Sequence, residues 1–271
     1  MRTFILFVLF LFSSLCYAVS PLNAPANAFD HAIWNSLLNS HVHSSNKGIT
    51  TSVDYQGVKA NTSALVTYLR QLAKVDQKQF DSWPKNDQLA FLINAYNAGT
   101  VELIIRAYPN IASIKDLGGF LSSPWKKKFI PLLEHTRSLD DIEHTLIRGA
   151  YRYNDPRIHF AVNCASIGCP ALRAEAYTGH RLSAQLQDQT KKFLSDPDRN
   201  RFEKQTLMVS SIFKWYKKDF EQGWQGFYSL EKFFAHYAGS LSLSAETKQK
   251  LENGEIDIIY LDYDWRLNDK Q

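Results

Sequence analysis

The stretch "HFAVNCASIGCP", residues 159–170, gathers side chains that could do chemistry: a histidine, an asparagine, a serine and two cysteines. A cysteine thiolate is a strong nucleophile when a neighbouring imidazole or a helix N-terminus lowers its pKa. The same two cysteines can instead form a disulfide or, with histidines, a zinc site. The C-x4-C spacing is longer than a short zinc knuckle and lacks a second close ligand pair, so we expect no metal and no cofactor. Cys164 as nucleophile and a Cys164–Cys169 disulfide both stay open.

The segment "SLDDIEHTLIRGA", residues 138–150, is the second candidate for chemistry. Ser138 and Asp141 predict a capping box, which fixes the phase of a helix whose inward stripe is Leu139, Ile142, Leu146 and Ala150. The opposite face then carries Asp140, His144 and Arg148, with Glu143 at its edge. An acid that orients an imidazole beside a fixed cation suits a general base or an anion site, but an ordinary solvated helix face has the same composition.

Polar residues elsewhere complete the candidate site. Asn94 and Asn97 lie three residues apart in "FLINAYNAGT", on an otherwise apolar helix. A buried amide must be hydrogen-bonded, so the two either fix a loop or donate to a substrate carbonyl. A thiol-dependent hydrolase or acyl transferase would use Cys164 as nucleophile, His144 or His159 as base, and Glu143 or Asp140 to orient that base.

The elements that position these residues are mostly helical. The apolar spacing predicts helices beginning after Asp30 and at Thr62, and further helices near 87–107, 139–150, 182–195, 211–220 and 229–238. A short strand and turn is expected around "VDYQG", and strands at "RIHFAVN", "TLMVS" and "IDIIYLDYDW". In the first of these, alternation puts His159, Ala161 and Asn163 on one face. We therefore expect a helix-rich α+β domain with a small, mainly antiparallel sheet.

The N-terminal segment indicates the cellular compartment of the protein. Residues 1–18 carry Arg2, an apolar run and Cys16-Tyr17-Ala18, the pattern of a signal peptide cleaved after Ala18. The apolar run is too short for a permanent anchor, so residues 19–271 are expected to form one exported domain, periplasmic or secreted, without a stable membrane anchor. Cleavage removes Arg2 and lowers the formal charge from +4 to +3. The basic residues are scattered, which argues against nucleic-acid binding.

Several ordered motifs resemble one family. "VDYQG", "FLINAYNAGT", "SLDDIEHTLIRG", "DPRIHFAVNCASIGCPAL", "IFKWYKKDF" and "YDWRLN" together are similar to the domain of unknown function 547, over roughly residues 53–268. The resemblance implies no reaction, but it groups the positions that match its motifs: Asn94, Asn97, Glu143, His144, Arg148, His159, Cys164, Ser166, Cys169, Pro170 and Asp264.

Two functions follow as hypotheses. In the first, the chain is a thiol-dependent hydrolase or acyl transferase, and Asn94, Asn97, Arg148, Ser166 and Asp264 help to bind its substrate. In the second, it is a non-enzymatic envelope domain with a Cys164–Cys169 disulfide. Either way the ligand is expected to be a small molecule, a peptide or a glycan. A nucleophilic Cys164 should react with an alkylating reagent more readily than Cys169.

Overall fold

The computed structural model describes residues 28–45, 48–119 and 122–270; the expected signal peptide lies outside these residues. Its N-terminal part is a group of helices around α5 (Lys85–Ile105), most of which is buried. The helices of this group before α5 are α1 (Ala32–His41), α2 (Tyr55–Ala60), α3 (Thr62–Ala73) and α4 (Gln77–Asp81). Two hairpins accompany them: β1 (Val42–Ser45) with β2 (Thr50–Val53), and β3 (Ile130–Leu132) with β4 (His135–Arg137).

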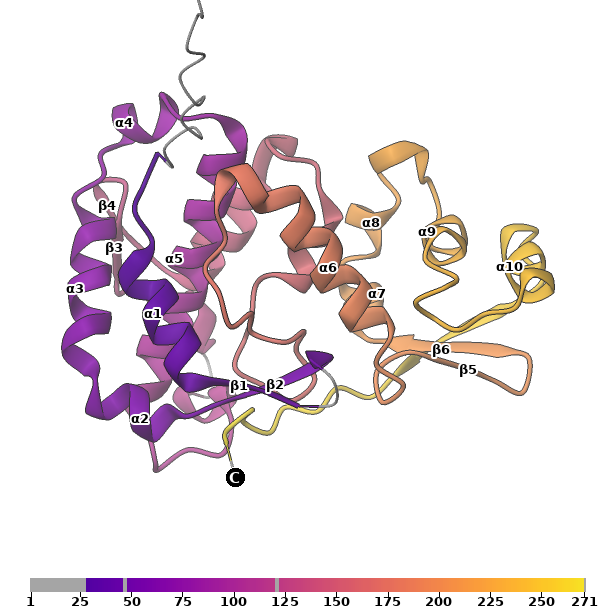
Figure 1. Cartoon of the computed structure of the whole chain (residues 1–271), viewed down its shortest axis with the longest axis horizontal. Helices are drawn as coiled ribbons and strands as arrows, with labels where there is room; N and C mark the ends of the chain where they lie inside the picture. Colours follow the sequence, from indigo (N-terminus) through magenta and orange to yellow (C-terminus); the bar gives the residue numbers. More distant parts are fainter. Residues whose placement is uncertain (1–27, 46–47, 120–121, 271) are drawn as a thin grey trace, which may run out of the picture.

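The C-terminal part is smaller and carries the three-stranded sheet (Figure 1). Strand β6 (Thr206–Ser210) lies in the middle, antiparallel to β5 (Arg201–Glu203) and parallel to β7 (Asp257–Leu261). The helices of this part are α7 (Ile212–Trp215), α8 (Lys217–Phe220), α9 (Leu230–His236) and α10 (Ala245–Glu252). Helix α6 (Leu182–Leu194) joins the two parts, because its first half packs with the N-terminal helices and its last residues pack with the C-terminal part. The helix-rich α+β class and the strands at "TLMVS" and "IDIIYLDYDW" are thus confirmed.

Two hydrophobic clusters hold the chain together. The first surrounds α5 and contains Trp34, Tyr68 and Phe91; the second is rich in phenylalanine and includes Phe213 and Phe233. The chain passes between them in the segment before Cys164, where Ile158 packs in the first cluster and Phe160 in the second. That segment therefore lies at the junction of the two clusters.

The predicted strand "RIHFAVN" is wrong, because Pro156–Phe160 forms a 3₁₀ helix. Pro156 occupies the first helical turn, where its missing N–H costs nothing, and the Asp155 carboxylate accepts a hydrogen bond from the Arg157 backbone N–H. Local capping therefore outweighs the β-forming tendency of this apolar stretch. The expected two-residue alternation of His159 and Asn163 is lost with the strand.

The helix predicted over 139–150 is also different in kind. Asp141–Ile147 is a π-helix, in which the Arg148 N–H reaches the Glu143 carbonyl five residues back. Ser138 and Asp141 do form the predicted reciprocal cap, with distances of 2.9 and 3.0 Å. The wider turn changes the inward stripe: Leu139 and Ile142 are buried as expected, Leu146 is only partly buried, and Ile147 replaces it. Ala150 is exposed.

Other predicted helices are confirmed with small changes. The helix over 211–220 is interrupted at Tyr216, whose φ of −111° and ψ of 20° separate α7 from α8. Helix α1 buries Trp34, Leu37 and Leu38 as the spacing indicated. Helices α2, α4 and α10 had no counterpart among the predicted helices; all three are short, and α10 buries only Leu251. The strand expected at "VDYQG" ends at Val53, and α2 begins at Tyr55 where a turn was expected.

Candidate active site

A cleft of about 240 Å³ lies where the two hydrophobic clusters meet. Its lining comes from α5, the π-helix, the loop around the cysteines, α7 and the chain after β7. The aromatic members are Tyr96, Trp125, Trp215, Tyr216, Tyr263 and Trp265. The ionisable members are Asp140, Glu143, His144 and His159, and the two sulfur-bearing members are Cys164 and Cys169. Four of the residues predicted as catalytic, namely Cys164, His144, His159 and Glu143, are thus brought together.

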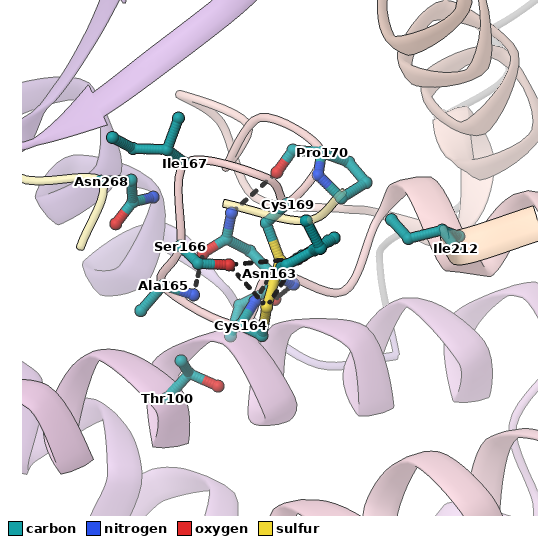
Figure 2. Close-up of a disulfide and its surroundings, with 12 residues drawn as sticks. Thr100, Asn163, Cys164, Ala165, Ser166, Ile167, Cys169, Pro170, Ile212 and Asn268 are labelled. Carbon is teal, nitrogen blue, oxygen red and sulfur yellow. Dashed lines mark hydrogen bonds between the residues drawn. A yellow bond between two sulfur atoms is a disulfide. The ribbon is translucent and has the colours of Figure 1, made fainter. Parts of the chain in front are cut away.

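The cysteine loop, residues 163–170, is held by a disulfide and by several hydrogen bonds (Figure 2). Cys164 and Cys169 form a disulfide, and the Cys164 N–H donates to the Cys169 sulfur. Asn163 spans the loop, because its side chain donates to the Pro170 carbonyl at 2.7 Å and accepts from the Ala165 N–H at 2.9 Å. Cys169 is buried, whereas Cys164 is half-buried. Cys164 is therefore the more accessible sulfur.

Two hydroxyl groups contact the Cys164 sulfur. Its Sγ lies 3.2 Å from Ser166 Oγ and 3.1 Å from Tyr263 Oη, and these two hydroxyls are themselves 3.1 Å apart. Burial raises the pKa of Tyr263, so its phenol stays protonated at neutral pH. Ser166 donates its hydroxyl hydrogen to Tyr263 Oη, so the Tyr263 hydroxyl is the one left to donate to a Cys164 thiolate, should the disulfide be reduced.

His159 is held by a carboxylate that the sequence analysis overlooked. Its Nε2 lies 2.8 Å from Asp219 Oδ2 on α8, and its ring stacks on Tyr216 with centroids 3.9 Å apart. Arg148 binds the same carboxylate through Nε at 2.6 Å and Nη2 at 3.1 Å. His159 is 2 % exposed, and its Nδ1 is buried with no hydrogen-bond partner.

The protonation states in this group follow from its contacts. Burial lowers the pKa of His159, and the hydrogen bond that its Nε2 donates to Asp219 offsets only part of that effect. Burial alone would raise the pKa of Asp219, but hydrogen bonds from His159 and Arg148, with the positive charge of Arg148, outweigh it and hold this pKa well below its usual value. A neutral imidazole that donates through Nε2 to an ionised Asp219 carries its free lone pair on Nδ1.

His144 has the predicted neighbours but no free nitrogen. Its Nε2 lies 3.5 Å from Asp140 Oδ1, and the Arg148 guanidinium contacts its Nδ1. Arginine can only donate, so Nδ1 of His144 acts as acceptor and Nε2 carries the proton. The face shared by Asp140, His144 and Arg148 is confirmed, and it engages both ring nitrogens of His144.

Glu143 is buried beneath the cleft. It is 5 % exposed, and its Oε1 has no hydrogen-bond partner. Burial, followed by the charge of Glu143, raises the pKa of both Tyr96 and Tyr216. The same carboxylate favours protonation of His159, although burial of that ring has the larger effect. Glu143 therefore places negative charge among aromatic rings.

Three predicted binding residues lie elsewhere. Asn94 makes a pair of hydrogen bonds with the backbone of Tyr177, at 2.8 and 3.0 Å. Asn97 donates to the Ala161 carbonyl at 2.9 Å and accepts from the Asn163 N–H at 2.8 Å. These amides fix loops, the first of the two readings considered for them. Asp264 forms an ion pair with Arg266 and lines a different pocket.

The missed residues come from the two C-terminal motifs. Asp219, Trp215 and Tyr216 belong to "IFKWYKKDF", and Tyr263 and Trp265 to "YDWRLN". Their signal was the resemblance of these motifs to a family, since neither segment carries a spacing that predicts chemistry on its own.

The described residues also bear on metal binding and on membrane spanning. Within residues 28–45, 48–119 and 122–270, no group of three or more His, Cys, Asp or Glu side chains could hold a metal ion. In the same ranges, no helix has the length and apolar character needed to cross a membrane.

Comparisons with known proteins give one match. No curated protein and no solved structure matches the chain. The one match is to a family model and covers residues 80–194, from within α4 to the end of α6. This segment includes Glu143, His159 and the cysteine loop, whereas Asp219 and Tyr263 lie beyond it. The wider extent expected from the motifs, 53–268, stays a prediction. Residues 80–194 match the family described as "Protein of unknown function, DUF547", and the resemblance that the motifs indicated is confirmed over that segment.

Proposed function

We propose that the chain is an exported thiol-dependent hydrolase or acyl transferase, with Cys164 as its nucleophile and His159 as its base. The observation that carries the proposal is the protonation and hydrogen bonding of His159. This side chain is a buried neutral imidazole, oriented by Asp219, that lines the same cleft as Cys164. Among the described residues its Nδ1 has no hydrogen-bond partner, Cys164 Sγ in the disulfide included, so this nitrogen is left to accept a proton. A nucleophile, a base and a carboxylate that orients the base are the groups that acyl transfer through a thiol requires.

His159 is favoured over His144 because of its free lone pair. Both rings line the cleft, but the nitrogens of His144 are engaged by Asp140 and Arg148. A base must accept a proton, and only His159 offers an unoccupied acceptor nitrogen. Asp219 takes the orienting role that the sequence analysis assigned to Glu143 or Asp140.

The Cys164–Cys169 disulfide is the resting, oxidised form in this proposal. A dithiol reductant supplies two electrons and two protons, which break the S–S bond, give two thiols and leave the reductant as a disulfide. His159 Nδ1 then takes the Cys164 proton, and the sulfur attacks the acyl carbon. The bond to the leaving group breaks, and that group takes the proton from His159. Water or an acceptor nucleophile cleaves the thioester and restores the thiol.

The test uses Cys169→Ser, which leaves Cys164 as a free thiol that cannot form the disulfide. The readout is the pH midpoint of Cys164 alkylation by iodoacetamide, followed by mass spectrometry. A rate at one pH is a poor readout, because a more acidic thiol gives a less nucleophilic thiolate. We expect the midpoint about 1 unit or more below the ordinary value of about 8.5.

Matched histidine variants decide which base acts. In the Cys169→Ser background, His159→Gln should raise the midpoint by about 1 unit toward the ordinary value, since the thiolate loses its base while the Tyr263 hydrogen bond remains. His144→Gln, the same substitution in the same cleft, should leave the midpoint unchanged. An ordinary midpoint that neither substitution moves would defeat the proposal. A shift with His144→Gln alone would overturn the role of His159.

The disulfide itself favours a second candidate function. A non-enzymatic domain would use the Cys164–Cys169 bond as a permanent staple around the cleft and bind a small molecule, peptide or glycan there. Closing so short a loop contributes about 2 kcal/mol in the loop-closure model, and an exported protein would keep the bond. In that case reduction changes stability but exposes no acidic thiol, which the alkylation experiment detects.

A further inference from the structure

The cleft combines negative charge with an aromatic wall, formed by Trp125, Trp215, Tyr263 and Trp265. Trp265 lies at the centre of the wall: its ring centroid is 4.4 Å from that of Tyr263, 5.7 Å from Trp215 and 5.8 Å from Trp125. Trp215 is 48 % exposed, which is unusual for so large an apolar side chain. Trp215 therefore offers exposed ring surface to a ligand that enters the cleft, and the other rings are partly exposed beside it.

The charged groups of the lining are of one sign. Asp140 and Glu143 contribute carboxylates, and neither lysine nor arginine is among the described residues that line this cleft. Arg148 lies beside the cleft, with its guanidinium 4.9 Å from the centroid of the Tyr216 ring, but it is already bound by Asp219. Glu143 is buried, and Tyr96 and Tyr216 hydrogen-bond to its carboxylate, yet its Oε1 has no hydrogen-bond partner within the described chain. A buried carboxylate oxygen without a partner is costly, and a donor brought by a ligand would remove that cost.

The aromatic wall already binds one cation of the chain itself. Lys115 Nζ lies 3.8 Å from the centroid of the Trp265 ring, well within the range of a cation–π interaction. Lys115 is exposed and does not line the cleft, so it shows the affinity of these rings for positive charge without filling the space beside Glu143.

We propose that the cleft recognises a compact organic cation, an alkylammonium group that packs against the tryptophan faces and is neutralised by Glu143. The inference rests on the proposed function in one respect, since it takes this cleft to be the place where substrate binds. It adds the substrate class: an acyl compound, or an acyl acceptor, that carries an amino or quaternary ammonium group.

The test compares choline with 3,3-dimethylbutan-1-ol, which has the same shape but carries a carbon in place of the charged nitrogen. Binding to the purified disulfide form is followed by tryptophan fluorescence and calorimetry. We expect choline to bind at least about ten-fold more tightly than the alcohol. Glu143→Gln should weaken choline binding by about ten-fold and leave binding of the alcohol unchanged. Glu255→Gln, which removes the same charge from a distant exposed turn, is the control and should change neither.

Equal affinities for choline and the alcohol, or no saturable choline binding below about 100 mM, would overturn the inference. If Glu143→Gln does not fold, the comparison of the two ligands on the wild-type protein still decides the question. Binding is measured without turnover, so the two proposals fail separately. Choline selectivity with an ordinary alkylation midpoint refutes the thiol enzyme alone, whereas an acidic Cys164 without choline selectivity refutes the cation site alone.

Discussion

At the scale of single residues, the site depends on which hydrogen-bonding capacities are already used. His144 and His159 lie in the same cleft, but only His159 has a nitrogen left without a partner. Similarly, the Asn94 and Asn97 amides bind backbone groups, whereas Glu143 keeps a free oxygen. Residue type and spacing pointed to all five of these residues, but an inventory of occupied donors and acceptors is needed to separate supporting groups from reactive ones.

Tyr263 provides a prediction at this scale. Its hydroxyl lies 3.1 Å from Cys164 Sγ and can donate to the thiolate, so Tyr263→Phe should raise the pKa of Cys164. A hydrogen bond to a charged group contributes about 1.5 to 3 kcal/mol, which corresponds to about 1 to 2 pKa units. The alkylation midpoint in the Cys169→Ser background measures the shift. Tyr228→Phe removes a hydroxyl from a tyrosine that is 70 % exposed and serves as control. Equal midpoints in both variants would contradict a role for the phenol.

At the scale of elements, local signals predicted some parts and misled in others. The Ser138–Asp141 cap was readable because capping depends on two residues three positions apart. The π-helix that follows the cap could not be predicted, because the apolar spacing of this segment fits an α-helix equally well. Only the packing of the whole fold, which buries Ile147, distinguishes the two. Likewise, the β-like composition of Ile158–Val162 gave way to the cap at Asp155 and to burial in two different clusters.

The cleft itself could not be predicted from these elements. Tyr263 and Cys164 are 99 positions apart in the chain, and Asp219 and His159 are 60 apart. Such pairs follow from how the two hydrophobic clusters pack together, which no local periodicity encodes. Motif resemblance suggested that the segments belong to one site, but it supplied no contacts.

Helix α5 supports the cysteine loop, and Asn97 is the link. Asn97→Ala would leave the Ala161 carbonyl and the Asn163 N–H buried without their partner. With each unsatisfied group costing about 1 to 3 kcal/mol, the free energy of unfolding should fall by about 3 kcal/mol in urea titrations. The disulfide should also be reduced faster, because Asn163 anchors its loop. Asn39→Ala, on the exposed face of α1, should change stability by less than about 0.5 kcal/mol. Equal losses in the two variants would show that α5 does not hold the loop.

At the scale of the whole molecule, lowering the pH should reduce the free energy of unfolding before most carboxylates become protonated. His31 is 6 % exposed in the cluster around α5, its Nδ1 lies 2.7 Å from the Tyr68 hydroxyl, and burial lowers its pKa to about 4. Burial lowers the pKa of His159 as well. The unfolded chain binds protons at its histidines near pH 6.5, whereas the folded chain resists protonation there. Stability from these residues is therefore fully present above pH 6.5 and is lost as the pH falls.

For His31 the loss runs from pH 6.5 down to about 4. A difference of about 2.5 pKa units corresponds to about 3 kcal/mol of unfolding free energy lost between pH 8 and pH 4. His31→Gln keeps a partner for Tyr68 but does not titrate, so its stability should depend on pH less steeply by about that amount. Urea unfolding of both proteins across this range measures the difference, with exposed His135→Gln as control. The depressed pKa of Asp219 affects both proteins equally and so does not obscure the difference between them. Parallel stability curves for the wild type and His31→Gln would mean that the fold tolerates a charged His31, which its position among Phe29, Tyr68 and Phe91 argues against.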